Sequence, residues 1–255
     1  MKRVFWLLPI FFVAACSDDG AVASTTPTTV AAPTPPPKPA YTPEDWKRDF
    51  ASTFEVSESK TDSSGITSYR ACFDLEGKKC STLMSGMKDG FRKVDHLTPP
   101  LTAFHEYTVK YPKKGAAASF VDLRVVAPQC REAATILNPV LHANTWLFMD
   151  KVAFMADGDV VYERTAEPQA VKRDTDDGRI WEKWTFKLET ADYAKLEKFA
   201  AAQSKIIRLS GDKGYTTMSK ESVDVFARDV IATIKATQTI NDALTKGGGP
   251  SCADL

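Results

Sequence analysis

Apolar side chains recur every three or four residues in two segments, and this spacing predicts two helices. In the first, Trp46 and Phe50 follow Thr42, which with the proline and acids after it is typical of a helix N-terminus. The spacing places Phe54 on the same face. The second helix begins after Ser219 and carries a long apolar stripe, which stops at a run of glycines near the C-terminus.

Alternating apolar and polar residues, together with short apolar runs, predict strands elsewhere. The segments are Tyr69 to Leu75, Tyr107 to Tyr111, Ser119 to Val126, Trp146 to Arg164 with a turn at Asp157–Gly158, Trp181 to Leu188, and Ser204 to Gly211. Thr190 is expected to cap a helix between the last two strands. The segment CREAATILNP predicts a short helix that stops before Pro139.

Strands joined by short turns, with helices at the two ends of this region, indicate an α+β domain. We expect an antiparallel β-sheet, either one sheet or two packed sheets, covered by helices and including a long C-terminal helix. After Arg179 the predicted order is strand, helix, strand, turn, strand, helix.

Residues 1–15 have the pattern of a signal peptide. Lys2 and Arg3 precede an apolar segment from Val4 to Val13, which is much shorter than the roughly 20 residues needed to span a bilayer. The segment ends in Val-Ala-Ala-Cys, which resembles the bacterial lipobox. By that resemblance the leader is removed and Cys16 is lipidated, so that the lipid holds the chain on a membrane.

Residues 16–40 are predicted to be a disordered tether, because a segment rich in Pro, Thr and Ala buries too little apolar surface to offset its ordering entropy. Residues 41–255 then form the soluble α+β domain, either undivided or divided near residues 115–120. Ser17, not aspartate, follows Cys16. By resemblance to the sorting rule of Gram-negative lipoproteins, this favours the outer over the inner membrane.

Four further cysteines indicate two disulfides, because an exported protein meets an oxidising compartment. Three pairings are possible. Cys72 and Cys80 flank a predicted hairpin turn, so a bridge between them is the simplest choice, and it leaves Cys130 to pair with Cys252. No C-x-x-C motif occurs, and the histidines are not spaced with the cysteines as metal ligands usually are. We therefore expect no metal site and no cofactor.

The charge balance argues against a nucleic-acid partner. Loss of Lys2 and Arg3 with the leader leaves 31 basic residues against 33 acidic ones, with the charges mixed along the chain. Proteins that bind nucleic acids normally carry a basic excess or a basic stripe.

No motif in the sequence specifies a catalytic site. Matches to the serine–lysine motif S-x-x-K begin at Ser57, Ser85 and Ser210. None begins a predicted helix, so this chemistry is not expected. The histidines are His96, His105 and His142, and they form no metal-binding motif. We predict no catalytic residue.

Trp181 is the surface ligand contact that the pattern indicates most specifically. In a strand, residues three apart point to opposite faces, so Trp181 and Trp184 cannot share a surface. Trp184 shares its face with Phe186 and should lie in the core, whereas Trp181 shares its face with Arg179 and Lys183. Trp181, Arg179 and Lys183 are therefore candidate ligand contacts.

These features indicate an envelope-anchored lipoprotein with a non-enzymatic binding or structural role, whose partner is an envelope protein or a glycan. Two alternatives stay open. One is a cell-wall or substrate hydrolase whose site is assembled from residues distant in the sequence. The other is a periplasmic immunity or inhibitor lipoprotein.

Overall fold

The computed structural model of the protein describes residues 40–99, 119–176 and 178–252. A compact unit runs from Pro39 to Leu255. The leader, Cys16, the tether before Ala40 and the predicted strand Tyr107–Tyr111 lie outside the described residues, as do His105 and most of the possible division near residues 115–120. In the described chain, no helix is both long and apolar enough to cross a membrane.

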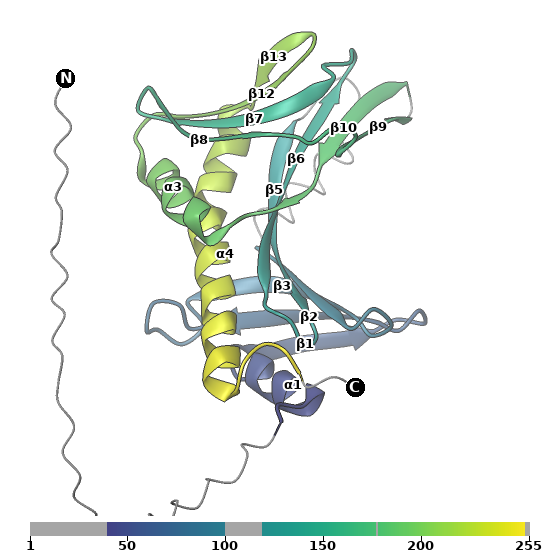
Figure 1. Cartoon of the computed structure of the whole chain (residues 1–255), viewed down its shortest axis with the longest axis vertical. Helices are drawn as coiled ribbons and strands as arrows, with labels where there is room; N and C mark the ends of the chain where they lie inside the picture. Colours follow the sequence, from purple (N-terminus) through teal and green to yellow (C-terminus); the bar gives the residue numbers. More distant parts are fainter. Residues whose placement is uncertain (1–39, 100–118, 177, 253–255) are drawn as a thin grey trace, which may run out of the picture. The chain divides into compact units, whose positions relative to one another are not determined.

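The described chain contains two antiparallel sheets (Figure 1). The larger has the strand order β1-β2-β3-β4-β5-β6-β10-β9, with β11 paired to β6. Its strands are β1 (Glu55–Thr61), β2 (Ile66–Phe73), β3 (Thr82–Asp89), β4 (Val94–Thr98), β5 (Phe120–Pro128), β6 (Ala134–Ala143), β9 (Val171–Asp176), β10 (Arg179–Trp184) and β11 (Phe186–Lys187). The smaller sheet has the order β13-β12-β7-β8. Its strands are β7 (Met149–Ala156), β8 (Asp159–Thr165), β12 (Lys205–Gly211) and β13 (Gly214–Thr217).

The helices of the described chain are α1 (Pro43–Ala51), α3 (Thr190–Ala201) and α4 (Lys220–Gly247). The predicted α+β fold with antiparallel sheets and a long C-terminal helix is therefore confirmed. The predicted order of elements after Arg179 is also observed, since α3 lies between β11 and β12, and α4 follows the β12–β13 hairpin.

α4 connects two hydrophobic clusters, and Figure 1 shows it running past both sheets. Its N-terminal half contributes Phe226 and Val230 to a cluster that includes β7, β12 and α3. Its C-terminal half contributes Ile240 and Leu244 to a second cluster, which includes α1 and β2. All four side chains are fully buried. The apolar stripe read from the sequence thus serves two cores in succession.

A chain of buried hydroxyl groups fixes the position of α4 against β6. Tyr193 OH donates to Thr135 Oγ1 (3.3 Å), which lies 2.8 Å from Thr237 Oγ1. Thr237 Oγ1 in turn donates to the carbonyl of Thr233, 3.0 Å away. Because buried polar groups need partners, a shift of α4 along β6 would leave these hydroxyls unsatisfied.

The helix predicted for CREAATILNP is wrong, because this segment enters β6, which runs from Ala134 through Pro139 to Ala143. On one side, β6 pairs with β10 as far as Val140 and with β11 from Leu137. Pro139 therefore lies where the ladder on that side is interrupted, and its missing N–H is tolerated there. The pairing of β6 with its neighbours overrides the local helical pattern.

The cap predicted for α3 is wrong by one residue. Thr190 is the first residue of the helix, and Glu189 is its N-cap. The backbone N–H of Glu189 donates to the side chain of Asp192 (3.3 Å), which closes a capping box one residue earlier than the threonine would.

Disulfides join Cys72 to Cys80 and Cys130 to Cys252, the pairing that was simplest from the sequence. The first closes the connection between β2 and β3. The second joins the turn between β5 and β6 to the residues that follow α4.

Replacing both Cys130 and Cys252 with Ser should destabilise the protein more than replacing both Cys72 and Cys80. The two bridges span sequence separations of 122 and 8 residues. The loop entropy that they remove from the unfolded chain corresponds to about 5 and about 2.5 kcal/mol. Urea unfolding measures the free energy of unfolding of the two double variants. An equal decrease in both would contradict the expectation.

Candidate functional site

A pocket of about 280 Å³ lies between α1 and strands β1 to β4. Trp46, Lys47 and Phe50 of α1 form one side of it. Tyr69 of β2 and Asp95 of β4 lie on the sheet side. The pocket is mainly apolar, and a carboxyl group reaches it from the sheet.

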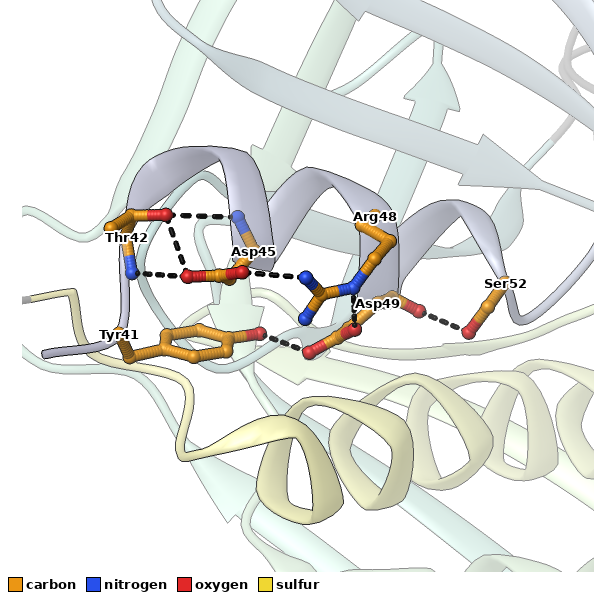
Figure 2. Close-up of polar contacts among 6 residues, drawn as sticks. All are labelled: Tyr41, Thr42, Asp45, Arg48, Asp49 and Ser52. Carbon is orange, nitrogen blue, oxygen red and sulfur yellow. Dashed lines mark hydrogen bonds and ion pairs between the residues drawn. The ribbon is translucent and has the colours of Figure 1, made fainter. Parts of the chain in front are cut away.

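Polar contacts along one side of α1 hold the helix that forms this wall (Figure 2). The backbone N–H of Thr42 donates to Asp45 Oδ2 (3.0 Å), and the N–H of Asp45 donates to Thr42 Oγ1 (3.2 Å). Arg48 bridges Asp45 and Asp49, with N···O distances of 2.5 and 2.9 Å. Tyr41 OH donates to Asp49 Oδ2 (2.8 Å). The hydrogen bonds from Thr42 hold the pKa of Asp45 below its ordinary value, which favours a charged carboxylate at the helix N-terminus.

The ends of α1 and α4 approach closely at a glycine. A Cβ on Gly247 would lie 1.6 Å from Asp49 Oδ2, so a larger residue there would displace the Asp49 side chain, which accepts the hydrogen bond from Tyr41. On the inner side of α1, Trp46 Nε1 donates to the carbonyl of Arg131 (3.2 Å), next to disulfide-bonded Cys130. α1 is therefore attached both to the end of α4 and to the turn between β5 and β6.

Four aromatic rings form a continuous wall of the pocket. The rings of Trp46 and Phe50 stack with centroids 5.0 Å apart, and Phe54 meets Phe50 edge-on at 5.1 Å. Phe54 also stacks on Tyr69 at 6.1 Å. Trp46, Phe50 and Phe54 were predicted to share one face. Phe54 does join the others, although it lies beyond the end of α1.

Tyr69 crosses β3 to reach Asp95, and Gly86 makes this possible. Tyr69 is paired with Gly86 across the β2–β3 ladder, and a Cβ on Gly86 would lie 2.2 Å from the Tyr69 ring. Tyr69 OH donates to Asp95 Oδ1 (2.8 Å). Asp95 is 7% exposed, and its burial raises the pKa of the carboxyl above the ordinary value, with opposing contributions from Tyr69 and Lys88.

Lysines surround the opening of the pocket. Lys47, Lys88 and Lys93 line it, and all three are exposed. Lys88 lies directly opposite Asp95 in the β3–β4 register. Among the described residues that line the pocket, Asp95 is the one carboxylate, so the local charge is positive even when Asp95 is ionised.

The candidate contacts Trp181, Arg179 and Lys183 lie together on one face of β10, and all three are half-buried. Trp181 is paired with Asp174 of β9 and His142 of β6. Trp184 is buried on the opposite face, as predicted, with its ring 4.3 Å from that of Phe186. None of the three candidate contacts lines the pocket beside α1.

The sequence did not single out Glu182, which is fully buried on β10. Its carboxylate accepts backbone N–H groups of Leu147 (2.7 Å), Phe148 (2.9 Å) and Met149 (2.5 Å). Arg173 Nε also donates to it (3.1 Å). These contacts hold the segment that enters β7, so Glu182 has a structural role.

The S-x-x-K matches are not arranged for serine–lysine catalysis. They lie on strands or at a strand end, and Ser85 and Lys88 point to opposite faces of β3.

His96 is half-buried on β4, where burial and Arg124 lower its pKa. His142 lines a second pocket, of about 510 Å³, and no described residue that lines it carries a carboxylate. No cluster of potential metal ligands was found in the described ranges.

The pocket beside α1 could be predicted only in part. The periodicity placed the aromatic residues on inward faces, but Asp95 and Lys88 carry no recognisable motif. Asp95 shares a face of the short strand β4 with Leu97, two residues further on, and this alternation is the one signal that could have indicated a buried carboxylate.

No family model matches the chain, and no curated protein matches it. Among solved structures, the crystal structure of the MHC-like protein MILL2 is similar over 60% of this chain and 67% of its own, with 8% identity and a TM-score of 0.23. A likeness this distant carries no argument about fold or function.

Asp95→Asn should reduce the pH dependence of stability. The amide oxygen can still accept the Tyr69 hydrogen bond, but the ionisable group is gone. Because the pKa of Asp95 is raised in the folded state, the folded protein binds this proton more tightly than the unfolded chain does. The contribution of Asp95 to the free energy of unfolding therefore grows as the pH falls toward the pKa of the unfolded chain, near 3.8. Urea unfolding of wild type and variant between about pH 4 and 8 measures the loss of this contribution.

Asp62→Asn is the matched control. Hydrogen bonds from Ser64 lower the pKa of Asp62, an exposed turn residue, so its contribution has the opposite sign and disappears as the pH falls. The same change in pH dependence for both variants would contradict the assignment at Asp95.

Proposed function

We propose that the protein is a lipid-anchored lipoprotein of the bacterial envelope whose globular unit binds an envelope component in the pocket beside α1. One observation carries the binding role: a mainly apolar pocket with aromatic walls and a rim of lysines. Pockets with this composition are the usual form of ligand sites in proteins. The anchoring rests on the lipobox-like sequence at Cys16.

The arrangement of groups in the pocket favours binding over catalysis. Its one described carboxyl, Asp95, is hydrogen-bonded to Tyr69, and its lysines are exposed at the opening. A nucleophile with a base in hydrogen-bond reach is the usual mark of covalent catalysis. The described lining residues supply apolar contact and positive charge instead.

The lipid anchor also determines whether the globular unit needs a membrane-binding surface. Attachment through two or three acyl chains is stable on its own, at about 0.8 kcal/mol per buried CH₂ group. The globular unit then needs no membrane-binding surface, and its pocket is free for another ligand. We propose the outer membrane as the site of attachment, since Ser17 follows Cys16.

Cys16→Ala should abolish lipid labelling and leave the protein in the soluble or uncleaved fraction, because the thiol is the proposed site of acylation. Metabolic labelling with a fatty-acid probe, followed by fractionation, measures this. Ser17→Ala is the control and should keep the label. Labelling that survives the loss of Cys16 would refute the lipobox interpretation.

A photo-crosslinking residue at position 56 should capture the bound component in intact envelopes, whereas the same residue at position 160 should not. Val56 lines the pocket and is 55% exposed. Val160 lies on β8, is 54% exposed and does not line the pocket, so it is a matched control. Intact-protein mass spectrometry detects the adduct. Equal capture at both positions, or none at position 56, would overturn the assignment of the pocket.

A further inference from the structure

We infer that the pocket beside α1 takes an amphipathic anion: an aromatic or short aliphatic group in the pocket, with a carboxylate or phosphate among the rim lysines. This inference rests on the proposed function and names the chemistry of the ligand. It follows from the lining, the charge and the size of the pocket.

The apolar part of the ligand is set by the aromatic wall. Trp46 and Phe50 are almost fully buried and Phe54 is half-buried, so only a small part of each ring is exposed to the pocket. The volume of about 280 Å³ is at the lower limit of small-molecule sites. The pocket therefore admits one aromatic ring or a short alkyl chain, whose burial displaces water from apolar surface.

The charged part is set by the lysines. The ammonium group of Lys47 lies 3.7 Å from Glu44, and both side chains are exposed, so this ion pair is weak. Lys88 and Lys93 form no ion pair among the residues the structure describes. An anion at the opening gains from all three charges, and its charged group stays near water, which keeps the desolvation cost small.

An organic cation is the alternative ligand, because aromatic rings beside a carboxylate also occur in sites for such cations. Asp95 Oδ1 already accepts the hydrogen bond from Tyr69, and burial favours the neutral carboxyl. A cation entering the pocket would also pass three ammonium groups. The charges therefore favour an anion.

Three probes that share a phenyl ring and a four-carbon chain test the inference: 4-phenylbutyrate, 4-phenylbutanol and 4-phenylbutylamine. 4-Phenylbutyl phosphate serves as a fourth probe with the same ring and chain, and it distinguishes a phosphate head group from a carboxylate. Calorimetric titration uses the full mature chain with Cys16→Ala, which avoids detergent. We expect one binding site, an affinity order of anion, alcohol, amine, and weaker anion binding at higher salt.

Lys88→Met with Lys93→Met should weaken binding of 4-phenylbutyrate roughly four- to twenty-fivefold, since each exposed charge contact contributes a factor of roughly two to five. Binding of 4-phenylbutanol should not change. The control is Lys60→Met with Lys172→Met, which removes the same charge from two exposed lysines outside the pocket and should leave both affinities unchanged.

Ala51→Trp tests the location. Ala51 is exposed at the edge of the pocket, so the substitution fills the pocket without removing a core contact, and it should abolish binding of both the anion and the alcohol. Equal affinity for all three phenyl probes, or preference for the amine, would overturn the inference. Capture at position 56 with no binding of any probe would overturn the ligand class and leave the proposed function standing.

Discussion

The packing of α4 against both hydrophobic clusters is the constraint on which the rest of the fold depends. At 1.5 Å per residue, its 28 residues extend about 42 Å, farther than one small core can cover. Asn241 helps to fix its position, because its side chain accepts the N–H of Ala133 (2.8 Å) and donates to the carbonyl of the same residue (3.0 Å). The Asn241 amide thus pairs with both the N–H and the carbonyl of Ala133, as the backbone of a neighbouring strand would. The hydroxyl chain at Thr135 and Thr237 continues the same alignment.

Local patterns predicted most of the elements, and the reason is physical. The stripe of α4 and the alternation of β2 are properties of short segments, and both elements bury the faces that those patterns indicate. Prediction failed where contacts with residues distant in the sequence determine the local structure. Pro139 indicated the end of a helix, yet its pairing with Val121 of β5 holds it within β6. Phe54 illustrates the same limit, since it joins its predicted partners through tertiary contact and not through the helix.

The pocket shows why a site is harder to predict than a fold. Tyr69, Gly86 and Asp95 lie on three successive strands, and their contact depends on the register and on a missing side chain at residue 86. No short motif encodes such an arrangement. The predicted contact Trp181 came from a sound argument about strand faces, and the face is as expected. That argument says which way a side chain points, but it does not say where the surface is hollowed.

The bridge between Cys130 and Cys252 makes the chain from β6 to the end of α4 a covalently closed ring. Every described residue that lines the pocket beside α1 precedes Cys130 and lies outside this ring. A mechanical load applied at Ala40, where the described chain begins, therefore reaches α1 before any part of the ring. The first contacts to bear it are the hydrogen bond of Tyr41 to Asp49 and that of Trp46 to Arg131, so the load acts on the wall of the pocket and on its attachment to the ring.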